Sequence, residues 1–161
     1  MRYIRDNFLL LSFFMIVGIA TLDAKNVFAG GDPSIKDSKI KKVVMCSGKI
    51  YYDLVEAREK NKKDKVIFVR LEQLYPFPAK TLANVLKRYK NAEFIWCQEE
   101  PKNMGAWNTV RNYIERTLEI INIKDINVKY VGRKASSSTA TGNANKHLAQ
   151  QKEILEKILK D

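Results

Sequence analysis

The chain has 161 residues, of which 45% are hydrophobic and 29% charged, and this composition is typical of one globular domain with a sizeable core. Its net charge of +11 favours acidic or phosphorylated partners, although a solvated, lysine-rich surface is the simpler explanation. Two cysteines and one histidine lack metal-ligand spacing, and no nucleic-acid recognition motif accompanies the charge, so neither a metal nor a nucleic-acid partner is expected.

Residues 1–29 differ from the rest of the chain. Two arginines precede the nearly unbroken apolar stretch Phe8–Leu22, and the small residues Val27 and Ala29 follow it, which is typical of a secretory signal peptide. The stretch is short for a membrane-spanning helix, which needs about 20 residues. We therefore expect a cleaved signal, an N-terminal anchor with membrane contact through residues 8–22, or an unrelated start acquired by gene rearrangement. Residues 30–40, which begin Gly-Gly-Asp-Pro, are predicted to be a linker.

A single α/β domain is predicted for residues 41–161, where short apolar runs alternate with amphipathic stretches. The predicted strands are Val43–Cys46, Val66–Leu71, Phe94–Cys97 and Ile126–Val131. The first three are apolar nearly throughout, as in parallel strands that are covered on both faces. The fourth alternates with polar residues, which indicates an edge strand.

Amphipathic helices are predicted after each strand because apolar residues recur there at helical spacing. They lie around Tyr51–Arg58, Leu82–Tyr89, Trp107–Ile121 and Leu148–Leu159. Four strand–helix units in succession predict a mostly parallel sheet between two layers of helices, which is a three-layer α/β sandwich with right-handed crossovers.

The carboxyl ends of parallel strands meet at one edge of a sheet, and polar residues follow every predicted strand. The residues expected along this edge, apart from the last loop, are Ser47, Gln98, Glu99, Glu100, Lys102 and Asn103. They form no catalytic set, because His147 is the only histidine and the adjacent Glu99 and Glu100 point opposite ways in an extended segment. No catalytic residue is therefore predicted.

The loop after the fourth strand is the best candidate for anion binding. It reads Arg-Lys-Ala-Ser-Ser-Ser-Thr-Ala-Thr-Gly before the last helix, so hydroxyls, backbone N–H groups and a helix N-terminus can surround a phosphate. Arg70 is expected to add a bidentate contact from a neighbouring strand end. The alternative is a Ser/Thr loop that only caps the helix. The candidate effector-binding or anion-binding residues are Arg70, Arg133, Lys134, Ser136, Ser137, Ser138, Thr139 and Thr141.

Four longer segments have distinctive amino-acid sequences. They read Cys-Ser-Gly-Lys-Ile-Tyr-Tyr-Asp-Leu, Arg-Leu-Glu-Gln-Leu-Tyr-Pro-Phe-Pro, Trp-Cys-Gln-Glu-Glu-Pro-Lys-Asn-Met-Gly-Ala-Trp and Tyr-Val-Gly-Arg-Lys-Ala-Ser-Ser-Ser-Thr-Ala-Thr-Gly. In this order they resemble the C-terminal domain of the E1 component of 2-oxoglutarate dehydrogenase, a thiamine-diphosphate enzyme. The resemblance runs from about Val43 to about Gln150 and implies the fold of a transketolase C-terminal domain.

In that family thiamine diphosphate, Mg²⁺ and the 2-oxo acid are held by two preceding domains, which are not found in this sequence. The resemblance therefore implies an isolated assembly or regulatory domain of a tricarboxylic acid cycle enzyme, which binds no cofactor by itself and is not catalytic alone. It also implies E1 partner domains or a second copy as partners, an adenine-nucleotide or acyl-CoA effector as in some relatives, and a cytoplasmic location. The alternative is a stand-alone nucleotide or acyl-CoA binding module, exported or anchored through its N-terminal segment.

Overall fold

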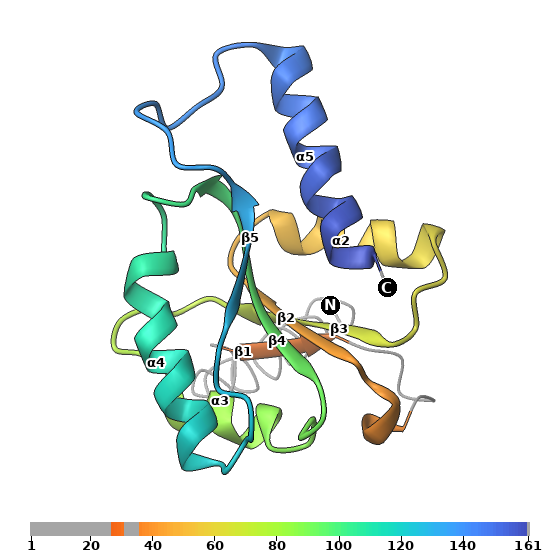
Figure 1. Cartoon of the computed structure of the whole chain (residues 1–161), viewed down its shortest axis with the longest axis vertical. Helices are drawn as coiled ribbons and strands as arrows, with labels where there is room; N and C mark the ends of the chain where they lie inside the picture. Colours follow the sequence, from red (N-terminus) through yellow and green to blue (C-terminus); the bar gives the residue numbers. More distant parts are fainter. Residues whose placement is uncertain (1–26, 31–35, 161) are drawn as a thin grey trace, which may run out of the picture.

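The computed structural model describes residues 27–30 and 36–160, and its centre is a five-stranded sheet with the order β1-β3-β2-β4-β5 (Figure 1). Strands β2, β3, β4 and β5 are parallel, and β1 pairs antiparallel with β3. The strand bounds are β1 (Val27–Gly30), β2 (Lys42–Cys46), β3 (Val66–Leu71), β4 (Glu93–Pro101) and β5 (Lys129–Arg133).

Helices cover both faces of this sheet. One face carries α2 (Ile50–Lys60) and α5 (Ala144–Leu159), and the other carries α3 (Ala79–Leu86) and α4 (Trp107–Ile120) (Figure 1). A short 3₁₀ helix, η2 (Asp37–Lys39), precedes β2. All four predicted helices are present, and the predicted three-layer α/β sandwich with a mostly parallel sheet is confirmed.

The sheet has a separate hydrophobic core on each face, because side chains alternate along a strand. On β2, Val43 and Met45 pack in the core under α3 and α4, whereas Val44 and Cys46 pack in the core under α2 and α5. All four side chains are fully buried, so the prediction of central strands covered on both faces is confirmed.

The folded domain extends beyond its predicted start at residue 41. Val27 pairs with Leu71 and Gly30 pairs with Phe68, and Ile40, inside the predicted linker, is 5% exposed. A short strand such as β1 can join a sheet edge through main-chain hydrogen bonds alone. For this reason no alternation of apolar and polar residues in the sequence indicated β1. The rest of the signal-like segment, residues 1–26, lies outside the described residues, and its role stays a prediction.

Strand β4 continues past its predicted end at Cys97. It reaches Pro101 because β5 pairs with it as far as Pro101 and Arg133, with an irregularity between Gln98 and Pro101. Gln98 and the two glutamates after it are therefore strand residues, where loop residues were expected. Strand β5 begins later than predicted, at Lys129, and lies at the edge of the sheet as its polar alternation indicated.

Candidate functional site

The segment of residues 98–107, which runs from the end of β4 to the start of α4, is organised by the side chain of Gln98, which is 3% exposed. Its carbonyl oxygen accepts hydrogen bonds from the indole N–H of Trp96 at 2.9 Å and from the backbone N–H of Trp107 at 3.0 Å. Its amide nitrogen donates to the carbonyl oxygen of Met104 at 2.7 Å and to two further main-chain oxygens of the segment. Gln98 therefore lies at the strand end where it was expected, and its polar atoms are used to close this segment.

The other residues expected at this edge are spread along it. Ser47 is half-buried in the turn between β2 and α2, while Glu100 and Lys102 are exposed. Asn103 donates from its side-chain amide to the Ser136 carbonyl oxygen, and its Oδ1 accepts from the Ser136 backbone N–H, both at 2.9 Å. Asn103 therefore fixes the predicted anion-binding loop to the 98–107 segment.

The segment of residues 133–143, between β5 and α5, is organised by the guanidinium group of Arg133. Its Nη1 donates to Thr141 Oγ1 at 3.0 Å, its Nη2 to the Thr139 carbonyl oxygen at 3.1 Å, and its Nε to the Glu99 carbonyl oxygen. The Thr141 hydroxyl donates in turn to Gln150 Oε1 on α5 at 3.0 Å. Arg133 therefore connects its own segment to both β4 and α5.

Some of the hydroxyl groups expected to surround an anion are used within the 133–143 segment. Ser138 Oγ donates to the Ala140 carbonyl oxygen at 2.7 Å, and Ser136 Oγ accepts from the Ser138 N–H at 3.2 Å. The cap of α5 is Asn143, whose side chain accepts from the Lys146 backbone N–H at 3.0 Å. Capping therefore does not account for the Ser/Thr run before it. The remaining hydroxyl candidates of the run are exposed: Ser137 and Thr139.

Two adjoining hollows open between the 133–143 segment and α5. The smaller has a volume of about 220 Å³, and the larger, of about 340 Å³, reaches along α5 to Glu153 and Lys157. The residues that line both are Arg133, Lys134, Ser136, Lys146 and Gln150. Positive side chains thus dominate both walls, and such a surface raises the local concentration of anions.

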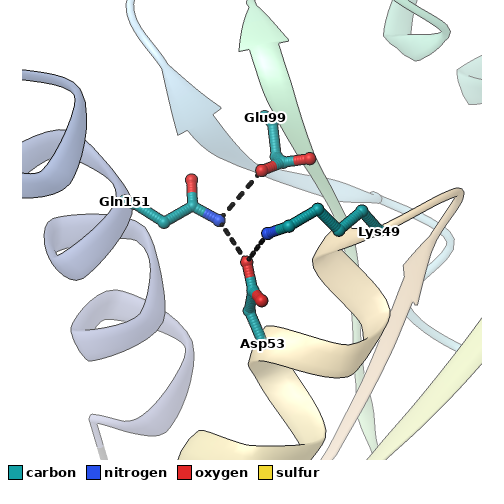
Figure 2. A network of polar contacts seen from close by, with 4 residues as sticks. All are labelled: Lys49, Asp53, Glu99 and Gln151. Atoms are coloured by element: carbon teal, nitrogen blue, oxygen red, sulfur yellow. Dashed lines mark hydrogen bonds and ion pairs between the residues drawn. The ribbon is translucent and has the colours of Figure 1, made fainter. Parts of the chain in front are cut away.

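A second polar network lies on the α2 side of α5. Figure 2 shows the Gln151 amide donating both to Asp53 Oδ2 at 2.9 Å and to Glu99 Oε1 at 3.0 Å, while Lys49 Nζ donates to Asp53 at 2.8 Å. The hydrogen bond to Asp53 raises the pKa of Lys49. Because Gln150 and Gln151 are consecutive, α5 is held to the 133–143 segment by one residue and to α2 and β4 by the next.

A larger groove, of about 710 Å³, lies between α2 and α5. The apolar side chains of Leu155 and Leu159 line it, but its rim carries charges of both signs. On this rim Lys60 pairs with Glu56. Since its charges largely cancel, the groove lacks the anion preference of the two hollows.

The structure does not bring Arg70 to the other candidate residues. Strands β2 and β4 lie between β3, which carries Arg70, and β5, which carries Arg133, so about 14 Å of sheet separates the two strands. Arg70 lies over the rings of Tyr51 and Tyr52 at 4.9 and 5.2 Å, donates to the Tyr52 hydroxyl at 2.7 Å and pairs with Glu72. The expected pocket containing both arginines is corrected, because chain order does not give strand order.

The described residues offer no candidate for a metal centre. Within residues 27–30 and 36–160 no group of histidine, cysteine, aspartate or glutamate side chains could hold a metal ion. Cys46 and Cys97 are free thiols paired in register on β2 and β4, and burial raises the pKa of both, that of Cys46 to about 12, which disfavours the nucleophilic thiolate. His147 is exposed on the first turn of α5.

Sequence reasoning missed the contribution of α5 to this region. Lys146 and Gln150 are four residues apart, so they share one face of the helix and both line the two hollows. Lys157 follows Lys146 after three helical turns on nearly the same face. This spacing is the signal that could have indicated a basic helix face. Among the described residues, no helix combines the length and apolar character needed to cross a membrane.

Comparison with known proteins places the chain in a family. The sequence model of the family described as 2-oxoglutarate dehydrogenase C-terminal matches residues 22–159. The 2-oxoglutarate dehydrogenase E1 components of Brucella anthropi and Brucella ovis are each 56% identical to the chain over 124 residues, which is 77% of this chain and 12% of each relative. The chain thus spans about an eighth of the length of these curated relatives. It belongs to the family of 2-oxoglutarate dehydrogenase E1 C-terminal domains.

Proposed function

We propose that this chain acts as the C-terminal assembly and regulatory unit of a 2-oxoglutarate dehydrogenase E1 component and does not decarboxylate 2-oxoglutarate alone. The observation that carries the proposal is an identity of 56% over 124 residues that nevertheless covers only 12% of each relative. Thiamine diphosphate and Mg²⁺ then belong to the E1 regions outside the match. The unit works in the cytoplasm beside those regions.

An exposed aromatic surface supports docking on E1 partner domains. The rings of Phe77 and Tyr113 stack with centroids 5.1 Å apart, which joins the connection before α3 to α4. Tyr75, in the same connection, is 87% exposed. Ile120 is 67% exposed and lies two helical turns after Tyr113, so the two share one face of α4. Apolar groups gathered in this way on a soluble domain mark surfaces that partners cover.

The test is complementation of an E1 component that lacks its C-terminal domain. The full chain is expected to form a complex with it on size-exclusion chromatography and to restore decarboxylation of 2-oxoglutarate with thiamine diphosphate. Tyr113→Glu and Ile120→Glu should each weaken the complex at least about tenfold, because a charge would be buried in the contact. Leu148→Glu changes a 65% exposed apolar residue on α5 and is the matched control.

Two results would contradict the assembly proposal. Decarboxylation by the chain alone would contradict the lack of catalysis. Failure of the chain to bind either the truncated E1 component or a second copy of itself would contradict the assembly role. Membrane contact through residues 8–22 stays a separate prediction, which fractionation after expression of the full chain would test.

The positive hollows favour a second candidate function, the binding of an adenine-nucleotide or acyl-CoA effector. The observation is that Lys134 and Lys146, from two different elements, line the same hollows as Arg133. Phosphates are the common anionic groups of these effectors. Calorimetric titration of the full chain with AMP and with acetyl-CoA tests the candidate, and no heat at about millimolar ligand on folded protein would remove it.

A further inference from the structure

The smaller hollow beside the 133–143 segment has a uniformly positive lining. Its charged lining residues are Arg133, Lys134 and Lys146, and none of its lining residues, all of which the structure describes, is acidic. Its volume of about 220 Å³ suits a phosphate group and falls below the roughly 300–1,000 Å³ of pockets that enclose whole ligands. Three like charges around one small hollow repel one another, so an anion between them is favoured.

The three cations differ in their hydrogen-bond partners. Arg133 donates to three protein oxygens. Lys134 and Lys146 are exposed, and neither ammonium group forms a hydrogen bond or ion pair with any residue in the described part of the chain. The nearby carboxylate of Glu153, which lines the larger hollow, is already paired with Lys157 at 2.7 Å. The two lysines are therefore available to a ligand, while Arg133 is already engaged.

We infer that the smaller hollow binds the phosphate group of a small phosphate monoester through the ammonium groups of Lys134 and Lys146, and that Arg133 positions the 133–143 segment around it. The inference rests on the effector-binding function proposed above and specifies the chemistry that such a ligand presents. The organic part of the ligand extends into the adjoining hollow of about 340 Å³, whose lining also includes Ile154 and the pair Glu153 and Lys157.

The assignment differs from the sequence prediction in two ways. Lys146, on α5, joins the recognition residues, because the helix packs beside the loop in the folded chain. Arg133 becomes a positioning residue, because its hydrogen bonds to Thr139 and Thr141 hold the segment in place and connect it to Gln150 on α5. A phosphate can be bound by the two lysines without breaking any of these hydrogen bonds.

The test is a nuclear magnetic resonance titration of the ¹⁵N-labelled full chain with inorganic phosphate, AMP and adenosine. Phosphate and AMP are expected to shift the backbone amide signals of Lys134 and residues 142–146, and adenosine, which has no phosphate, is not. In the double variant Lys134→Gln with Lys146→Gln, the affinity for phosphate and for AMP should fall at least about tenfold, because two charge-assisted hydrogen bonds to the phosphate are removed. Lys152→Gln is the control, since it removes a 78% exposed lysine on the same helix outside both hollows.

The outcomes separate this inference from the effector function. Equal shifts with adenosine and AMP, unchanged affinity in the double variant, or no response to phosphate in the folded wild-type chain would each overturn the phosphate site. If AMP binds and the double variant binds it equally well, the effector function stands and the site assigned here is wrong. If phosphate and AMP bind equally and both are lost in the double variant, the site stands and recognition of adenine is excluded.

Discussion

The two segments at the carboxyl edge of the sheet meet the same structural requirement with different chemical groups. Each runs from the end of a strand to a helix, residues 98–107 from β4 to α4 and residues 133–143 from β5 to α5. The organising group is the buried, neutral amide of Gln98 in the first segment and the half-buried, charged guanidinium of Arg133 in the second. Both groups hold main-chain oxygens of their own segment in place.

The difference in burial and charge separates a scaffold from a binding surface. A buried amide cannot exchange protein partners for water, so each hydrogen bond broken there leaves a group that is neither bonded nor solvated. A guanidinium near the surface is less sensitive, because water replaces the missing partner. Substitutions should therefore affect stability most in the 98–107 segment and the ligand response most in the 133–143 segment.

The largest expected effect is that of Gln98→Leu. The substitution keeps the volume of the side chain but removes the partners of the Trp96 indole N–H, the Trp107 backbone N–H and the Met104 carbonyl oxygen. We expect the free energy of unfolding to fall by about 4 kcal/mol, since each orphaned buried group costs about 1–3 kcal/mol. Urea unfolding measures the change. Asn108→Ala, an exposed substitution on the next helix, should stay within about 0.5 kcal/mol of the wild type, and a Gln98→Leu variant equally close to it would refute the scaffold role.

The comparison can be sharpened with one glycine from each segment. Gly105 and Gly142 have φ angles of 65° and 68°, so alanine at either position has a similar backbone cost of about 1 kcal/mol. A Cβ at Gly105 would lie 2.9 Å from Gln98 Nε2 and 3.0 Å from Glu100 Cβ, whereas one at Gly142 would meet nothing within 4 Å. Thermal and urea unfolding should therefore show Gly105→Ala to be less stable than Gly142→Ala by about 1–3 kcal/mol. Equal losses would mean that the 98–107 segment can adjust around Gln98.

The regular part of the fold could be predicted from the sequence because its signals are local. Apolar runs such as Val66–Leu71 and the apolar stripe of α4 are visible in the sequence at the period of a strand or a helix. Strand β1 gives no such signal, since an edge strand pairs through its main chain. Strand order is also absent from local patterns, and for this reason Arg70 was expected beside a loop from which two strands separate it.

The candidate site was predictable only where its residues are close in sequence. Arg133 and Lys134 stand together in a polar loop after a strand, and that position indicated anion binding. Lys146 approaches them only when α5 packs on the sheet, so the local pattern can indicate a basic helix face but cannot place Lys146 beside the loop. Gln98 was placed at the edge of the sheet because it follows an apolar run, but its hydrogen bonds to Trp96 and Met104 become visible only in the folded segment.

A smaller effect on stability is expected for Arg133→Gln. The variant loses the hydrogen bonds to Thr139 and Thr141, but at a half-buried position water can replace part of them, so we expect a loss of about 1–2 kcal/mol. Amide hydrogen exchange should rise across residues 133–143 and much less across residues 98–107, where the variant loses the bond from Arg133 Nε to the Glu99 carbonyl oxygen. Lys146→Gln should leave exchange in both segments at the wild-type level. Unchanged exchange around Thr141 in Arg133→Gln would contradict the positioning role of Arg133.

The smallest effect is expected where the two segments meet, at the hydroxyl of Tyr130. This group lies 3.2 Å from the Glu100 carbonyl oxygen and 2.9 Å from the Arg133 carbonyl oxygen, so it links the ends of β4 and β5. Tyr130→Phe should lower the free energy of unfolding by about 1 kcal/mol at neutral pH. Urea unfolding would detect this change, and a loss as large as that of Gln98→Leu would contradict the ranking of the two segments.

The pH dependence of the same variant gives an independent check. Burial, with smaller contributions from Cys97 and Glu100, raises the pKa of Tyr130 from 10.0 to about 12. Between these two pH values Tyr130 has lost its proton in the unfolded chain but keeps it in the folded chain. The contribution of the Tyr130 hydroxyl to stability is therefore complete below pH 10 and decreases as the pH rises toward about 12. The buried thiol of Cys46, with its pKa also raised to about 12, likewise lowers the stability as the pH rises, and it does so equally in the wild type and in Tyr130→Phe. The stability of Tyr130→Phe should therefore decline less steeply than that of the wild type in this range. Equal slopes in urea unfolding would mean that the Tyr130 hydroxyl is solvated and does not join the two segments.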